Sequence, residues 1–174
     1  MTVDSVHRTL VSMWKDSPAK IDRLVISGGE PMAQVRTLIP LINRIRPTFK
    51  NIEIETSGVI PLPLKLSGVY FNVSPKLLHA QTKRPYNLDV LREYARRSMA
   101  RFKFVVQDVS DFDEVDLIVS SCNLPHDRVW IMPLGVGRHE LMERTQRIAD
   151  EVIKRGYNLT TRLHILMWGN RRGV

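Results

Sequence analysis

Hydrophobic positions along the chain follow two periods that alternate from its first residues onward. Between residues 2 and 15 they recur about every 3.6 residues, which predicts an amphipathic helix. Residues 24–26 form a short apolar run that ends at two glycines, a pattern typical of a buried strand in a parallel sheet. Pro31 suits the first position of the next helix, whose apolar stripe extends to Ile45.

The same alternation continues to the end of the chain. Asn87 and Asp111 are predicted N-caps, because their side chains can accept hydrogen bonds from the first free amides of a helix. Gly156 is a typical residue after the last helical turn. Further helices are expected at residues 88–98, 112–121 and 140–155, and further strands at residues 52–55, 70–73, 102–106, 129–132 and 163–167.

Six alternations of strand and helix imply an α/β fold with a mostly parallel sheet and right-handed crossovers, either open or curled into a partial barrel. No linker, internal repeat or shift in composition divides the chain. We therefore expect residues 1–174 to form a single domain, long enough to bury a hydrophobic core.

Composition narrows the class of protein. The hydrophobic and charged fractions, 43% and 25%, are ordinary for a soluble globular protein. No apolar run approaches the length of a membrane span, and the first residues lack the apolar stretch of a signal peptide, so a cytoplasmic location is expected. The single cysteine, Cys122, excludes an internal disulfide and an all-cysteine metal site within one chain.

The net charge of +8 favours an anionic partner, but the basic residues are dispersed. Those of residues 92–101 recur at helical spacing and are typical of a solvated helix face. The aromatic fraction is only 7% and does not interleave with the basic residues, which argues against direct nucleic-acid binding. The chain also contains no P-loop, dinucleotide-binding fingerprint or His/Cys cluster, so ATP, NAD and zinc chemistry have little support.

Candidate binding residues follow the predicted strands, because parallel βα folds gather their active sites at the carboxyl ends of the strands. Gly28 and Gly29 allow a close backbone approach and leave amides free at a helix N-terminus, which favours a carboxylate or phosphate. Glu30 adds a carboxylate that can hold an ammonium group, so the three residues can grip both ends of an amino acid. The alternative is a tight strand-to-helix turn with Glu30 in its first turn.

Other candidates also have two interpretations. Thr56 offers a hydroxyl to a polar ligand, or simply ends a strand that turns at Gly58. Lys76 can pair with a carboxylate, or extend into solvent from a loop. His164 falls within the strand predicted at residues 163–167, where a lone histidine is more often a hydrogen-bonded structural residue than a catalyst.

Taken in order, these motifs resemble the 7-carboxy-7-deazaguanine synthases of the radical S-adenosylmethionine (SAM) superfamily. Gly-Gly-Glu-Pro at residues 28–31 is similar to the SAM-binding motif of that superfamily. The resemblance covers essentially the whole chain and implies a partial (βα)6 barrel of the radical SAM type. The remaining matching motifs are Glu-Thr-Ser-Gly at 55–58, Ser-Pro-Lys at 74–76, Met-Pro at 132–133, and Arg162, His164, Trp168, Gly169 and Gly173.

The resemblance implies a reaction. SAM and a reduced [4Fe–4S] cluster generate a deoxyadenosyl radical that converts 6-carboxy-5,6,7,8-tetrahydropterin to 7-carboxy-7-deazaguanine, with Mg²⁺ assisting, on the route to queuosine and related bases. Ser27, Thr56 and His164 would lie beside the pterin. No catalytic residue and no metal ligand within the chain is implied with certainty. The residues implied to contact SAM are Gly28, Gly29, Glu30, Ser74, Pro75 and Lys76.

The chain departs from the family at its beginning. Members carry an N-terminal strand and a loop with three cysteines before the first helix, and Cys122 cannot replace three thiolates. The resemblance therefore implies a barrel whose first strand and cluster loop are missing and whose isolated chain is inactive. A late start site, a split gene with a complementary N-terminal fragment and a decayed copy all remain open. So do a homodimer and the alternative function of a non-catalytic ligand- or protein-binding module.

Overall fold

The computed structural model describes residues 2–63, 65–83 and 85–171. Within them, six parallel strands form one sheet in the order β1-β2-β3-β4-β5-β6, so each strand pairs with its neighbour in the sequence. Parallel pairing requires the chain to cross back outside the sheet between strands. The strands are β1 (Arg23–Ile26), β2 (Asn51–Thr56), β3 (Tyr70–Val73), β4 (Ala100–Val106), β5 (Val129–Pro133) and β6 (Asn158–Leu159).

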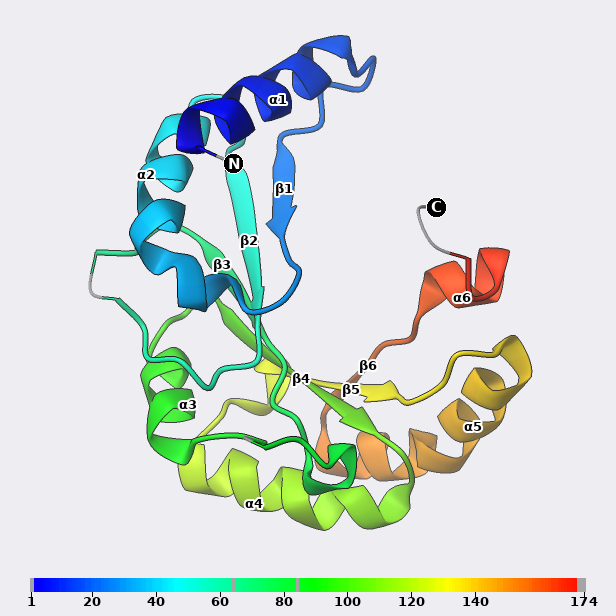
Figure 1. The fold of residues 1–174 in the computed structure, drawn as a ribbon. Coiled ribbons are helices and arrows are strands. Elements are labelled where there is room, and N and C mark those ends of the chain that lie inside the picture. The colour runs from blue at the N-terminus through cyan, green and yellow to red at the C-terminus, as the bar shows by residue number, and fades with distance from the viewer. Residues whose placement is uncertain (1, 64, 84, 172–174) are drawn as a thin grey trace.

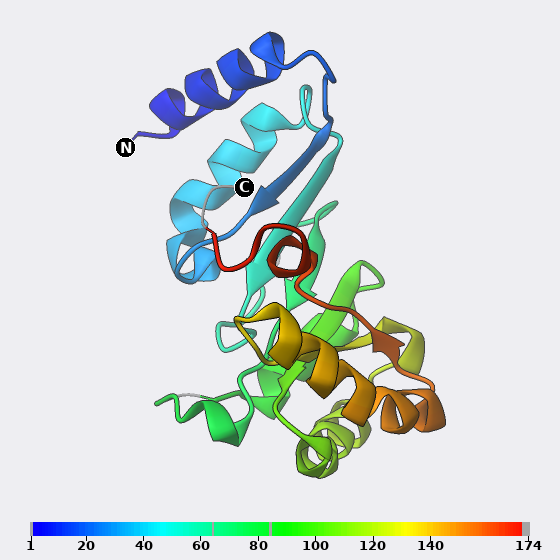
Figure 2. The same cartoon turned by 90° about the vertical axis from the view of Figure 1, so that its right-hand side faces the viewer.

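The sheet curls into a half-open barrel with its helices on the outer, convex side (Figure 1). Turned by 90°, the same arrangement shows α1 and β1 at one end and β6 with α5 at the other, while α6 lies between them in this view (Figure 2). The α-helices are α1 (Val3–Asp16), α2 (Val35–Ile45), α3 (Leu88–Ala95), α4 (Phe112–Cys122), α5 (Arg138–Arg155) and α6 (Leu163–Trp168). No helix within the described ranges has the length and apolar character to span a bilayer.

The two faces of the sheet differ in polarity. In β2 and β4, buried residues alternate with partly or fully exposed ones, as expected where helices cover one face only. The buried positions, such as Ile54, Phe71 and Phe104, pack with α2, α3 and α4 into one core. The opposite positions, such as Glu55, Asn72 and Lys103, face the concave side. The concave side of β2, β3 and β4 therefore carries polar and charged side chains that are open to a ligand. Arg101 also lies in β4, so its predicted place on a solvated helix face is wrong.

The strand predicted at residues 163–167 is wrong: these residues form helix α6. The amide of Ile165 donates to the carbonyl of Arg162, and that of Gly169 to the carbonyl of Ile165, both at 2.9 Å. Only Ile165 of this helix is fully buried, whereas Leu163 is 61% exposed. A short apolar run does not distinguish a strand from a helix by its periodicity alone. The sixth strand lies earlier and contains only two residues, Asn158–Leu159.

The other predicted elements are confirmed to within a few residues, and the caps give mixed results. Asn87 caps α3 by accepting from the amides of Asp89 and Val90. Gly156 ends α5 with a φ of +66°. Asp111 makes no side-chain cap of α4; its carboxylate instead accepts from amides of the preceding turn, Gln107 and Asp108. The helix predicted from Pro31 begins with a 3-10 turn, η1 (Pro31–Gln34), ahead of α2.

Candidate functional site

The turn after β1 is made of glycines because of its backbone conformation. Gly28 and Gly29 have φ angles of +96° and +59°, which residues with a Cβ rarely adopt. A Cβ built on either glycine would meet no other atom within 4 Å. The turn therefore faces open space, so its bare backbone is accessible to a ligand.

Glu30, directly after this turn, ties it to the end of β2. Its Oε1 accepts from the hydroxyl of Thr56 at 2.7 Å and the amide of Met32 at 3.1 Å. Its Oε2 accepts from the amide and hydroxyl of Ser57 at 2.8 and 2.6 Å. Burial raises the pKa of Glu30, but the hydrogen bonds from Ser57, Thr56 and Met32 outweigh burial and lower the pKa below its ordinary value.

These four hydrogen bonds support the alternative interpretation of Glu30 as a residue that stabilises the turn. Both carboxylate oxygens are already engaged within the protein. The contact between Glu30 and the amino group of SAM stays a prediction.

A cavity of about 200 Å³ lies beside the glycine turn, at the carboxyl ends of β1, β2 and β3. The structure brings six of the predicted site residues to its wall, namely Ser27, Gly28, Gly29, Thr56, Ser74 and Lys76. Pro75 instead lines the neighbouring cavity, and His164 lines neither of the two. The other lining residues are Glu55, Ser57, Asn72 and Lys103.

Asn72 and Lys103 were missed in the sequence analysis. Both lie inside strands, on the face opposite to buried Phe71 and Phe102. Period-two alternation would have assigned them to the uncovered face of the sheet. It would not have identified that face as a cavity wall, because this depends on the curvature of the sheet.

The charges on the cavity wall suit a zwitterion. Glu55 accepts a hydrogen bond from the hydroxyl of Ser27 at 2.7 Å and lies 3.8 Å from the ammonium of Lys103. Lys76 has an exposed side chain and, within the part of the chain that the structure describes, no ion pair. Its amide is fixed by the carbonyl of Pro85 at 3.0 Å. The carboxylate of Glu55 and the ammonium groups of Lys76 and Lys103 thus face one cavity. The open backbone of the glycine turn borders the same cavity.

A second cavity, of about 450 Å³, adjoins the first through Lys76 and extends along the ends of β4 and β5. Its wall is mainly apolar, with Leu77, Met132 and Pro133 among its residues. His79, also on this wall, has its Nδ1 3.2 Å from the carboxylate of Asp111. The two connected cavities together have one polar and one mainly apolar compartment.

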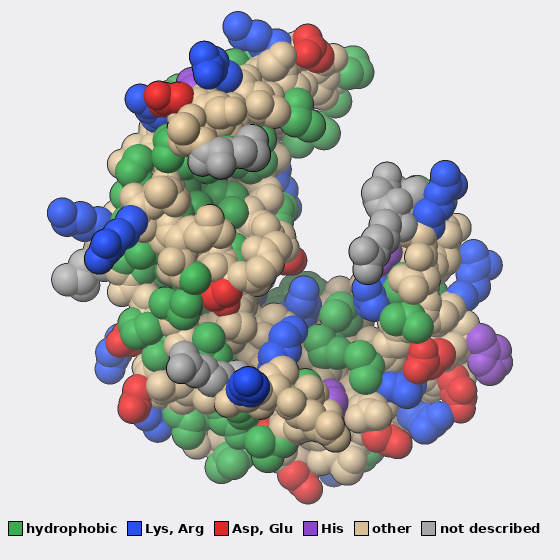
Figure 3. All heavy atoms as spheres, viewed as in Figure 1, with side chains coloured by type: hydrophobic (Ala, Val, Ile, Leu, Met, Phe, Trp, Pro, Cys, Tyr) green, Lys and Arg blue, Asp and Glu red, His purple; other side chains and the backbone are tan. Residues whose placement is uncertain are grey.

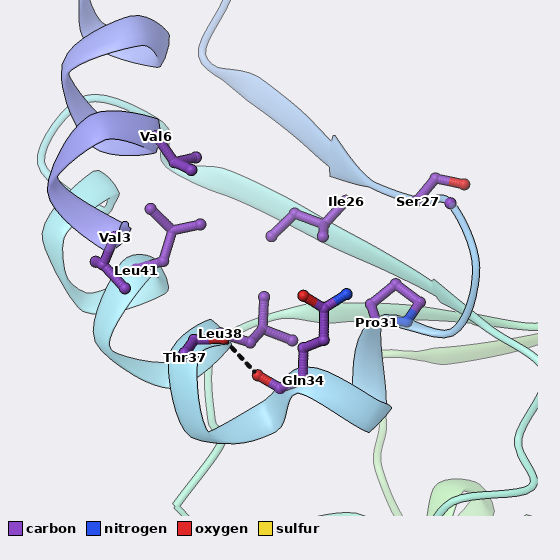
Figure 4. A pocket seen from close by; sticks show the side chains of 10 residues that line it. Val3, Val6, Ile26, Ser27, Pro31, Gln34, Thr37, Leu38 and Leu41 are labelled. Atoms are coloured by element: carbon purple, nitrogen blue, oxygen red, sulfur yellow. Dashed lines mark hydrogen bonds between the residues drawn. The ribbon is translucent and has the colours of Figure 1, made fainter. Parts of the chain in front are cut away.

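A third cavity, of about 360 Å³, lies on the other side of the glycine turn, between α1 and α2 (Figure 4). Val6, Ile26, Leu38 and Leu41 project toward it from three elements. Ser27, Gln34 and Thr37 add polar groups to this otherwise aliphatic wall. The cavity adjoins β1. Within the described residues, β1 pairs with β2 along one edge and has no partner strand along the other.

The described residues do not fit an iron–sulfur cluster. Among them, no group of three or more His, Cys, Asp or Glu side chains is placed to hold a metal ion. Cys122 is buried on α4, where its Sγ lies 3.6 Å from the carbonyl of Leu88, and burial raises the pKa of its thiol. The cavity beside the glycine turn, in contrast, offers ammonium groups and open backbone to a ligand that carries a carboxylate.

Structure comparison defines the class of fold. Two structures of SuiB from Streptococcus suis, one of them bound to S-adenosylmethionine, match with a TM-score of 0.65 and 13% identity. The matches cover 97% and 95% of this chain and 45% of each SuiB chain. This likeness confirms the predicted fold class, an α/β partial barrel with a parallel sheet.

Sequence comparison defines the family, although no family model matches the chain. The 7-carboxy-7-deazaguanine synthase of Pyrobaculum aerophilum is 37% identical over 156 residues, which cover 88% of this chain and 68% of that protein. The synthase of Hyperthermus butylicus is 34% identical over 151 residues, 83% of this chain and 64% of that protein. The chain belongs to the 7-carboxy-7-deazaguanine synthase family, and it spans about two thirds of the length of these relatives.

Proposed function

We propose that this chain forms the greater part of a cytoplasmic radical SAM enzyme that converts 6-carboxy-5,6,7,8-tetrahydropterin to 7-carboxy-7-deazaguanine. The observation that carries the proposal is the cavity in which the Gly28–Gly29 turn meets Ser74 and Lys76, in a chain 37% identical to a named synthase. The product would be a precursor of queuosine and related deazaguanine bases.

SAM would bind at the cavity beside the glycine turn. The free backbone of Gly28 and Gly29 and the ammonium of Lys76 suit the carboxylate of its methionine part. Ser74, whose amide continues the sheet by donating to the carbonyl of Thr56 at 2.8 Å, sets the position of the Ser-Pro-Lys segment. The adjoining apolar cavity, which includes Pro75, offers space for the rest of the molecule.

Ser27 and Thr56 would face the pterin from the same end of the sheet. Ser27 lines the cavity and is held by Glu55, so its hydroxyl has a fixed position. Thr56 is buried, and its hydroxyl donates to Glu30 and accepts from the amide of Gly58. Thr56 therefore acts on a ligand mainly by holding the cavity wall in shape. His164 lies on α6, beyond the two connected cavities, and would reach the pterin only from the C-terminal side.

The [4Fe–4S] cluster of such enzymes supplies the electron for SAM cleavage, and Mg²⁺ assists the reaction. No step is assigned to either group, because the described residues lack their ligands. A homodimer or a complementary N-terminal fragment would be the macromolecular partner.

The test is turnover by the complete protein. Coding sequence upstream of the Met1 codon is read for a cysteine triad, and the extended polypeptide is expressed anaerobically with iron and sulfide. Cluster absorbance, deoxyadenosine and 7-carboxy-7-deazaguanine are then measured. Release of both products supports the proposal. A protein that holds a cluster but never cleaves SAM would falsify it.

A second candidate function, a non-catalytic module that binds a ligand or another protein, is favoured by the outer edge of β1, which has no partner strand among the described residues. Backbone groups of an edge strand are available to a further strand. Under this alternative no in-frame cysteine triad is found upstream, and the chain binds its partner without SAM turnover. An active extended enzyme would exclude it.

A further inference from the structure

A short segment between β3 and α3 forms one wall of the mainly apolar cavity of about 450 Å³. Residues 77–83, which we call the strap, follow Lys76 directly and include the 3-10 turn η2 (Leu78–Ala80). Figure 3 shows this side of the molecule hollowed, with hydrophobic side chains on the floor of the hollow. The strap residues that line the cavity are Leu77, His79, Ala80 and Thr82. The position of the strap therefore sets the width of the cavity.

The strap belongs to a loop whose two ends are held together. The amide of Lys76 donates to the carbonyl of Pro85 at 3.0 Å, and this hydrogen bond closes the loop at its base. Leu77 is fully buried and anchors the beginning of the strap, whereas Leu78 is 64% exposed and residues 80–83 are exposed as well. A loop with adjacent ends and few buried side chains can move as one body about its base.

Glu114, on the first turn of α4, fastens the strap to the rest of the molecule (Figure 1). Both of its carboxylate oxygens lie 3.1 Å from the amide of Leu78, which donates to them. Other strap amides, those of Ala80 and Gln81, donate to carbonyls within the strap itself. Within the part of the chain that the structure describes, Glu114 is therefore the main hydrogen-bonding contact between the strap and α4.

His79 and Gln81 are held in unfavourable surroundings while the strap lies against α4. The Nδ1 of His79 is 3.2 Å from the carboxylate of Asp111, but it is buried and makes no hydrogen bond among the described residues. A buried polar atom without a hydrogen bond is costly. Gln81 has a φ of +49°, which residues with a Cβ rarely adopt. Movement of the strap away from α4 would relieve both costs.

We propose that the strap is a movable wall of the apolar cavity and that Glu114 is the latch that holds it closed. Opening breaks the hydrogen bonds at Leu78 and separates His79 from Asp111, while buried Leu77 and the base of the loop stay in place. The cavity beside Lys76 then widens to admit or release a ligand. The inference does not depend on the proposed function, because it concerns a motion of the chain without a ligand.

The test is amide hydrogen exchange of the chain and two variants. Glu114→Ala removes the latch, so exchange of the amides of residues 78–82 should accelerate on the order of tenfold, as expected when a hydrogen bond to a charged group is lost. Glu143→Ala is the matched control, because its exposed carboxylate on α5 pairs with Arg147 and lies outside the cavity wall. Binding of anilinonaphthalene sulfonate, a dye that fluoresces in apolar cavities, is measured in parallel.

Faster exchange confined to the strap, together with stronger dye fluorescence in Glu114→Ala alone, supports the proposal. Exchange in β4 reports on the whole fold; if it accelerates equally, Glu114 stabilises the fold in general and the latch is wrong. Unchanged exchange in the strap overturns the proposal as well, and so does faster exchange without stronger dye fluorescence. None of these outcomes bears on the proposed function, because SAM takes no part in the measurement.

Discussion

Glu30 and Ser57 are joined by two hydrogen bonds to one oxygen, since Glu30 Oε2 accepts from the Ser57 amide at 2.8 Å and from its hydroxyl at 2.6 Å. The pair connects the turn after β1 to the end of β2, the two segments that border the cavity proposed for SAM. The position of the glycine backbone thus depends on a carboxylate that is itself fully hydrogen-bonded.

Glu30→Gln should destabilise the fold. The amide would present a donor where the carboxylate now accepts, so the free energy of unfolding at pH 7 should fall by about 1–3 kcal/mol. Urea unfolding of both proteins measures the difference.

The same pair predicts a pH dependence. The pKa of Glu30 is lowered in the folded protein, so its stabilisation is present above the ordinary value of 4.5 and is lost as pH falls through the lower folded pKa. The difference in free energy of unfolding between wild type and Glu30→Gln should therefore shrink below pH 4.5. A difference that stays constant down to pH 3 would contradict the role of the ionised carboxylate.

Gly29→Ala should abolish most SAM binding. The added methyl would project into the open cavity, where it would hinder the approach of a ligand to the turn. Gly156→Ala is the matched control, because Gly156 has a similar φ of +66° and equally open surroundings, but lies at the end of α5. Each substitution should cost about 1 kcal/mol of stability through the left-handed backbone.

Equilibrium dialysis with labelled SAM separates the two glycine variants. Loss of binding in Gly29→Ala alone supports the site. Equal binding by both variants would place SAM elsewhere.

Tyr94→Phe should change how stability depends on alkaline pH. Burial, followed by the charges of Glu30 and Glu93, raises the pKa of Tyr94 to about 12. Because the folded pKa lies above the unfolded value of 10.0, the stabilisation by Tyr94 is present at neutral pH and is lost as pH rises from 10 toward 12. At pH 7 the variant should be about 1 kcal/mol less stable, because the hydrogen bond to the carbonyl of Ile60 is lost.

Chemical unfolding between pH 7 and pH 11 tests the Tyr94 prediction. The stability gap between wild type and variant should narrow above pH 10. A gap that widens there would contradict the raised pKa.

Ile165→Ala should loosen α6. Ile165 is the one fully buried residue of this helix, and truncating a buried isoleucine costs about 2 kcal/mol or more. Leu163→Ala, at a position 61% exposed on the same helix, should have little effect. Amide hydrogen exchange across residues 163–168 should accelerate in the first variant only. Equal acceleration in both would show that burial of Ile165 does not hold the helix.

Hydrophobic periodicity predicted most of the fold, because an element buried on one side has apolar residues at regular intervals in its sequence. The helix at Val3–Asp16 and the strands through Pro133 follow such patterns. Residues 163–167 were wrongly predicted as a strand because five residues are too few to distinguish the strand period from the helix period. Asp111 was wrongly predicted to cap the helix that follows it. Its carboxylate accepts from two amides of the preceding turn instead, and the sequence does not show which of the nearby amides a carboxylate will bind.

The sequence by itself determined the order of strands and helices, the need for glycine after β1, and the motifs that resemble a radical SAM family. Local backbone preference and one-sided burial set these features, and both act over a few residues. Only the tertiary structure decided that Glu30 is saturated by Thr56, Ser57 and Met32, and that Glu114 binds the amide of Leu78. These relationships join residues far apart in the chain, and they depend on the register and curvature of the sheet.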